Sequence, residues 1–284
     1  MSLHRQLLGG ALAAAIVSIA LSGCERPSAM VVLRGGPSLL DVFRHVGGEY
    51  EQAHSGVEIV PEFNCPLCVL PVIDGAVGRI DVVVATGSRD IERFRESDEV
   101  AFGEPIPFGT GALALAVPLA SNTAIHALGD LLDDRVSSVG ISDPETTELG
   151  RATKQAMSNA GIWEELRAAG AGGDGKLKIA PTGCKLLQWL RLGECDAAIV
   201  FDFCVSGAKP PARLVDRLRP GTYDPVPLMM AVNERSPSRV EAQRFVAYVT
   251  GTEGARSLVA AGVSPAEAHQ PDALRDHTER DEQL

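Results

Sequence analysis

The sequence is short of positive charge and contains none of the compact motifs that mark common metalloproteases and hydrolases. Its 26 Lys and Arg residues stand against 37 Asp and Glu residues, which gives a formal net charge of −11. This balance argues against nucleic acid as a partner, because binding to nucleic acid relies on neutralising phosphates with Lys and Arg. The sequence also lacks His-x-x-x-His, His-Glu-x-x-His and Gly-x-Ser-x-Gly patterns. We therefore assign no catalytic residue and expect a protein without enzymatic activity.

Only the N-terminal region carries a long apolar run. Met1 to Arg5 is a short basic start, and Leu7 to Ala20 is dominated by Ala, Leu and Ile. A basic start, a short apolar run and small residues after it are typical of a secretory signal rather than of a membrane span. The run ends in LSGC, which resembles the bacterial lipobox, whose cysteine is lipidated and becomes the mature N-terminus. We expect residues 1–23 to be a signal peptide and residues 24–29 to be the lipid anchor, on Cys24, and its tether.

A lipidated start places the rest of the chain outside the cytoplasm. Several acyl chains together hold a protein firmly on a membrane surface, so we expect the periplasmic face of the bacterial envelope. Removal of the signal takes away Arg5 alone among the basic residues, which leaves 25 against 37 acidic ones and a net charge near −12. Such a chain has no general field that attracts anions, so any anion site must be local.

Strand-like apolar runs alternate with helical patterns along the body of the chain. This alternation predicts an α/β fold with parallel strands covered by helices on both faces. About 260 mature residues are enough for two small lobes or one large domain. We predict a polar, disordered tail over residues 265–284. The clearest predicted strands are Val31–Leu33, Val57–Val60, Ile80–Ala85, Leu177–Ala180 and Ala197–Phe201, and the clearest helices are Leu39–Gln52, Val69–Val77 and Thr147–Ala160.

Five segments, in order, resemble the periplasmic molybdate-binding proteins, which deliver oxyanions to ABC importers. The longest is GISDPETTELGRATKQAMSNAGIWEELRA, in which Asp143-Pro144-Glu145, Gly150 and Gly161-Ile162-Trp163 fall at the family's positions. The others are PSLLDVF, GRIDVVVATGSRDIERF, LRLGECDAAIVF and RFVAYVTGTEGARSLVAAGV. Each match is weak alone, but the five together extend over the chain from Val31 to Gly262.

The resemblance implies a type II solute-binding fold, with two α/β lobes, parallel-rich sheets and two hinge strands. Lobe 1 would comprise residues 30–112 and 228–264, and lobe 2 residues 113–227, with the hinge near Leu113–Val117 and Tyr223–Val232. The ligand would lie between the lobes at helix N-termini, whose amides and dipole bind anions without a countercharge. The implied partners are a small inorganic ligand and an ABC permease with its ATPase, and we expect a monomer.

The family's ligand contacts are only partly present in this sequence. Ser38 retains the first-motif serine, while Leu149 and Gly183 match positions that contribute backbone amides. Phe201 stands where the family has a tyrosine, so one hydroxyl is lost. The family's serine-rich second motif is FNCPLC here, and its proline has no N–H to donate. The resemblance therefore implies a site that has lost three polar donors.

Cysteines occupy several of the altered positions. Cys65 and Cys68 lie in FNCPLC, Cys184 follows Gly183, and Cys204 follows Phe201. All four map to the ligand cleft of the implied fold, whereas Cys195 is predicted to be a buried structural residue.

Three interpretations of the four cysteines remain open. They are disulfides of an oxidising compartment, a thioredoxin-like redox pair, or a thiolate site. The last would hold a soft metal, trivalent arsenic or an iron–sulfur cluster on Cys65, Cys68, Cys184 and Cys204, and we favour it. The class-different alternative to an importer component is accordingly a metal- or redox-handling protein of the cell envelope on the same scaffold.

Overall fold

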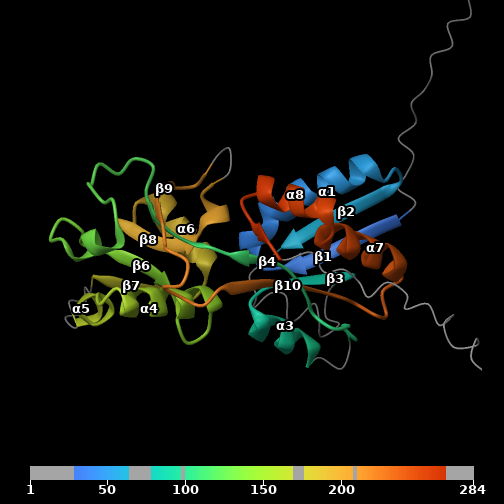
Figure 1. Ribbon diagram of the computed structural model, residues 1–284, viewed down its shortest axis with the longest axis horizontal. Coiled ribbons are helices and arrows are strands. Elements are labelled where there is room, and N and C mark those ends of the chain that lie inside the picture. Colours follow the sequence, from blue (N-terminus) through green and yellow to red (C-terminus); the bar gives the residue numbers. More distant parts are fainter. Residues whose placement is uncertain (1–28, 64–77, 97–99, 169–175, 207–209, 267–284) are drawn as a thin grey trace, which may run out of the picture.

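The computed structural model describes residues 29–63, 78–96, 100–168, 176–206 and 210–266, which form two α/β lobes side by side (Figure 1). The predicted signal peptide with Cys24, both cysteines of FNCPLC, the helix predicted over 69–77 and nearly all of the C-terminal tail lie outside these ranges. Within them, no helix has the length and hydropathy needed to cross a bilayer.

The first lobe is built on a six-stranded mixed sheet with the order β11-β4-β10-β3-β1-β2. β1 pairs in parallel with β2 and β3, whereas β10 runs antiparallel to β3 and β4. The strands are β1 (Ala29–Gly35), β2 (Val57–Phe63), β3 (Val82–Thr86), β4 (Ile106–Gly111), β10 (Val226–Val232) and β11 (Ser264–Pro265). The helices are η1 (Pro37–Leu39), α1 (Leu40–Ala53), α3 (Ser88–Arg95), α7 (Arg239–Thr250) and α8 (Thr252–Ala260).

The run of apolar residues in β3 is explained by its burial on both faces. Val82 and Val84 pack into the core that includes α1, while Val83 and Ala85 pack against Ile91 of α3. Successive side chains of a strand point to opposite faces, so a strand covered on both sides is apolar throughout. This packing places the carboxyl end of β3 between two layers of helices, at the edge that faces the second lobe (Figure 1).

The second lobe is built on a five-stranded mixed sheet with the order β7-β6-β8-β5-β9. β6 is parallel to β7 and β8, and β5 is antiparallel to β8 and β9. The strands are β5 (Leu113–Val117), β6 (Val139–Ser142), β7 (Leu177–Ala180), β8 (Ala197–Phe201) and β9 (Arg213–Arg217). The helices are α4 (Glu148–Asn159), α5 (Trp163–Ala168), α6 (Gly183–Leu192), η2 (Leu128–Leu132) and η3 (Asp202–Cys204).

The described chain passes from one lobe to the other at two places. The first crossing is one residue long: Gly111 pairs with Val226 in the first sheet, and Leu113 pairs with Phe201 in the second. The second crossing runs from the end of β9 to the start of β10. The first crossing directly precedes the predicted hinge stretch Leu113–Val117, which forms β5, and the second crossing overlaps the start of the predicted stretch Tyr223–Val232, most of which forms β10. The whole of the second lobe is thus inserted between two strands of the first.

Candidate ligand-binding cleft

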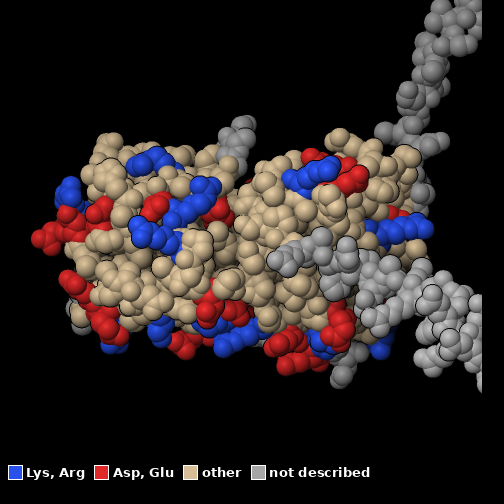
Figure 2. Space-filling view, viewed as in Figure 1, with Lys and Arg blue, Asp and Glu red and all other residues tan. Residues whose placement is uncertain are grey.

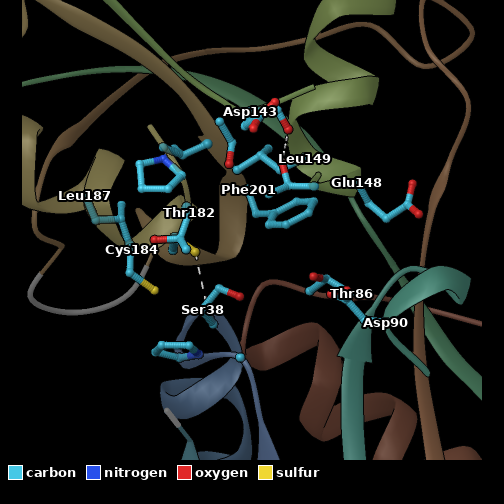
Figure 3. A pocket seen from close by; sticks show the side chains of 18 of the residues that line it. Ser38, Thr86, Asp90, Asp143, Glu148, Leu149, Thr182, Cys184, Leu187 and Phe201 are labelled. Atoms are coloured by element: carbon cyan, nitrogen blue, oxygen red, sulfur yellow. Dashed lines mark hydrogen bonds between the residues drawn. The ribbon is translucent and has the colours of Figure 1, made fainter. Parts of the chain in front are cut away.

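A cavity of about 330 Å³ lies between the lobes (Figure 3). The segments that follow β1 and β3 line it from the first lobe, and those that follow or end β6, β7 and β8 line it from the second. The carboxyl ends of five strands therefore meet at one place. In open α/β sheets, ligands bind in crevices outside the carboxyl ends of the strands, so this cavity is the candidate site.

Two helices of the second lobe begin in the cavity wall. Thr147 caps α4 by accepting a hydrogen bond from the Gly150 amide over 3.0 Å, and Thr182 caps α6 by accepting from Lys185 over 3.3 Å. The first amides of a helix have no acceptor within it, and Leu149 and Gly183 carry such amides in the wall. The two helix starts can therefore receive an anion through N–H groups and the positive ends of their dipoles.

The structure places the described members of the predicted site in one cavity. Ser38 lines it from the first lobe, and the members from the second lobe are Leu149, Gly183, Cys184, Phe201 and Cys204. That these residues bind a ligand stays a prediction. Cys65 and Cys68 lie outside the described residues, and Cys195 is buried beneath the sheet of the second lobe, as predicted, with 1% exposure.

The two cleft thiols belong to different elements of the second lobe. Cys184 lies in the first turn of α6, and Cys204 ends η3. The Cys204 thiol donates a weak hydrogen bond across the cleft to the Ser38 carbonyl oxygen, with sulfur and oxygen 3.8 Å apart. Burial raises the pKa of Cys204 far above its usual value, and the nearby Cys184, Asp202 and Asp41 raise it further. Cys204 is therefore a neutral thiol at physiological pH.

Three carboxylates in the wall were not predicted as site residues. Asp90 comes from α3, Asp143 follows β6, and Glu148 opens α4. Glu148 forms an ion pair with Arg151, whose Nε lies 3.0 Å from the carboxylate. No Lys, Arg or His is among the described residues that line the cavity. Asp90 and Asp143 lie just beyond buried strands, a position typical of site residues in α/β folds, but acids are not part of the oxyanion-site motifs that this sequence resembles.

The wall also holds a buried hydroxyl without a partner. Ser142, at the end of β6, is fully buried, and within the described part of the chain its Oγ has no hydrogen-bond partner. Buried polar groups are nearly always hydrogen-bonded. A donor or acceptor on a bound ligand would satisfy this hydroxyl.

On one side of the cavity the two lobes touch through a glycine. Gly87 precedes α3 with a φ of +102°, and a Cβ at this position would collide with the Glu148 side chain. Only glycine combines this backbone conformation with so close an approach. Figure 3 shows Glu148 and Asp90 on this side of Phe201, and Cys184 and Leu187 on the other. The cleft therefore has a carboxylate side and a thiol side.

Known proteins share both the sequence pattern and this geometry. The sequence profile described as "Bacterial extracellular solute-binding protein" matches residues 31–264. The chain belongs to this family. A curated relative, YvgL of Bacillus subtilis (strain 168), is named as a substrate-binding lipoprotein of an ABC transporter. It is 16% identical over 223 residues, which cover 78% of this chain and 82% of the relative.

Solved structures establish that this member of the family has the type II fold. The periplasmic molybdate-binding protein of Azotobacter vinelandii superimposes with a TM-score of 0.68 at 16% identity, covering 84% of this chain and all of that one. The substrate-binding domain of a molybdenum ABC transporter from Clostridium difficile gives a TM-score of 0.64, with the same identity and coverage. At such low identity the likeness concerns the fold alone.

Proposed function

We propose that this chain is the lipid-anchored, extracytoplasmic solute-binding protein of an ABC importer, with its ligand held in the cleft between the lobes. The observation that carries the proposal is a cavity at five strand ends, into which the N-termini of α4 and α6 open opposite Ser38. Family membership and the lipoprotein name of the Bacillus subtilis relative support it. An ABC permease with its ATPase is the implied partner.

Ligand capture in this arrangement is a closure of the lobes. The cavity wall contains Ser38 and Thr86 of the first lobe and Leu149 and Gly183 of the second. A ligand that contacts both sets stabilises the closed state over the open one by its differential affinity, and the crossing strands carry the rotation. Capture and release in this scheme are binding steps, and we assign no catalytic residue to them.

The ligand class differs from that of an unmodified oxyanion site. Three carboxylates line the described wall without a basic residue, and residues 64–77, which follow β2, contain no Lys, Arg or His. Glu148 is paired with Arg151, but a doubly charged oxyanion would still face the carboxylates of Asp90 and Asp143, and it would lack the hydroxyl that Phe201 cannot supply. We therefore propose a small inorganic ligand whose binding uses the cysteines of the cleft.

A second candidate function is a metal- or iron–sulfur-handling protein of the cell envelope on the same scaffold. It is favoured by the presence of Cys184 and Cys204 in one cavity wall, and by the family resemblance, which implies that Cys65 and Cys68 belong to the same cleft. Metal and acid-labile sulfide analysis of anaerobically purified protein distinguishes the two. A stoichiometric resident metal or cluster favours the second candidate, and a metal-free protein that binds added ligand favours the first.

Small-angle X-ray scattering tests the importer proposal. Molybdate, sulfate, phosphate, arsenite and Zn²⁺ would first be screened by thermal shift, because a ligand bound only by the folded state raises the melting temperature. The proposal expects at least one stabilising ligand to reduce the radius of gyration. A stabilising ligand that leaves the scattering profile unchanged would refute closure. Metabolic labelling with a radioactive fatty acid, with Cys24→Ala as the control, tests the anchor.

A further inference from the structure

Cys184 and Cys204 bring two thiols to one wall of the cavity from separate elements. α6 supplies the first thiol and η3 the second, and both side chains line the same space. Figure 3 shows Cys184 near Ser38, and the Cys204 thiol contacts the Ser38 carbonyl oxygen. The third described cysteine, Cys195, lies elsewhere, buried beside Gly140.

We propose that Cys184 and Cys204 form a two-sulfur binding site for a thiophilic ion, either a soft d¹⁰ metal ion or a trivalent metalloid. This inference names the ligand class for the proposed function. It rests on that function in one respect, that the ligand binds in the cleft. Soft ions select thiolate ligands over the oxygen ligands that hard cations prefer. The pair belongs wholly to described residues and does not depend on the cysteines of FNCPLC.

The environment of the pair suits capture of such an ion. Binding to thiols releases protons because the ligand form is the thiolate. The unpartnered Ser142 hydroxyl and the carboxylates of Asp90 and Asp143 line the same cavity. The hydroxyl can donate a hydrogen bond to water or hydroxide that the ion retains, or accept one from it, and the carboxylates can accept.

Ion binding at this pair is coupled to the contact between the lobes. The proton of Cys204 is the donor that reaches the Ser38 carbonyl oxygen of the first lobe. Its loss on ligation removes that donor, so the bound and unbound states differ in an interlobe contact. Ion binding to the two thiols of the second lobe would thus change a hydrogen bond to the first lobe.

Phenylarsine oxide is a suitable probe because it reacts with two neighbouring thiols. The arsenic forms two As–S bonds and loses its oxygen, and the two thiol protons leave with that oxygen as water, with no change of oxidation state. The full-length protein with Cys65→Ser and Cys68→Ser isolates the described pair. Intact-mass spectrometry under reducing-agent-free conditions would count the phenylarsenic groups bound.

The proposal expects one phenylarsenic group on the Cys65→Ser/Cys68→Ser protein. Adding Cys184→Ser or Cys204→Ser should abolish the adduct, whereas adding Cys195→Ser, the matched control, should leave it unchanged. Circular dichroism melting of each variant shows that the protein is folded. Absence of the adduct in the folded parent variant, or its survival after Cys184→Ser, would overturn the two-thiol site. Neither outcome touches the importer proposal, whose test is ligand-induced compaction.

Discussion

The Tyr223 hydroxyl accepts a hydrogen bond from the Leu113 amide over 2.9 Å and so joins the two crossings between the lobes. Both groups are buried, and the Leu113 carbonyl oxygen in turn accepts from the Leu218 amide over 2.9 Å. The residue at which the second sheet begins is thus held by two contacts from the returning chain. These contacts hold the two crossings in a fixed position relative to one another. We therefore expect both crossings to bend together when one lobe rotates relative to the other.

Tyr223→Phe should destabilise the protein without changing its fold. The substitution leaves the buried Leu113 amide without its acceptor, which costs about 1–3 kcal/mol. Urea unfolding followed by circular dichroism should show a lower midpoint with an unchanged slope. An unchanged midpoint would show that another group accepts from this amide.

Gly183→Pro should weaken ligand binding while preserving α6. Gly183 is the first residue of the helix, a position that proline favours, and Thr182 before it has φ −149° and ψ 156°, which proline tolerates at the preceding residue. The change removes one amide donor from the cavity wall, so affinity for a ligand that uses it should fall by about 5- to 150-fold. Gly183→Ala keeps the amide and is the control for calorimetry. Equal affinities of the two variants would exclude this amide as a contact.

Gly87→Ala should hold the lobes apart. A methyl group at this position meets the Glu148 side chain, and the φ of +102° is strained for alanine. We expect weaker ligand binding and a larger radius of gyration in the presence of ligand. Gly48→Ala is the control, since Gly48 lies in α1 with open space around its Cα and the change should stabilise the helix by about 0.5–1 kcal/mol. A Gly87→Ala protein that binds and compacts normally would contradict a closed state with this contact.

Molybdate should bind poorly to the native protein. The cavity lacks a tyrosine hydroxyl at Phe201 and is lined by three carboxylates, and each missing hydrogen bond costs on the order of 1–3 kcal/mol. Phe201→Tyr should restore one donor and raise the affinity by about tenfold, which corresponds to 1.4 kcal/mol. Sub-micromolar binding to the native chain in calorimetry would contradict this prediction.

Regular apolar segments were predictable from the sequence almost to the residue. The strands Leu177–Ala180 and Ala197–Phe201 have the predicted bounds, and the helix predicted over Thr147–Ala160 begins one residue later because Thr147 is its cap. β4 and β9 were not predicted. β4 contains Pro107 and two glycines, and β9 is a charged edge strand, so neither has the apolar pattern of a buried strand.

The site was predictable where the family resemblance supplied positions, and not elsewhere. Cys184 and Cys204 were placed together because their neighbours Gly183 and Phe201 match ligand positions. The carboxylates of Asp90 and Glu148 line one cavity because Gly87, which precedes α3, lies against the Glu148 side chain at the start of α4, and no local pattern encodes that approach. Their arrangement depends on the angle between the lobes, which is a property of the assembled fold.

The insertion of the second lobe between β4 and β10 determines which half of the molecule the membrane restrains. β1, the first described strand, lies in the first lobe and begins at Ala29. With the proposed anchor on Cys24, five residues of chain reach at most roughly 17 Å. The first lobe would therefore stay close to the bilayer. The second lobe, which is covalently connected to the first through the two described crossings, would be the one that moves relative to the membrane when the cleft opens or closes.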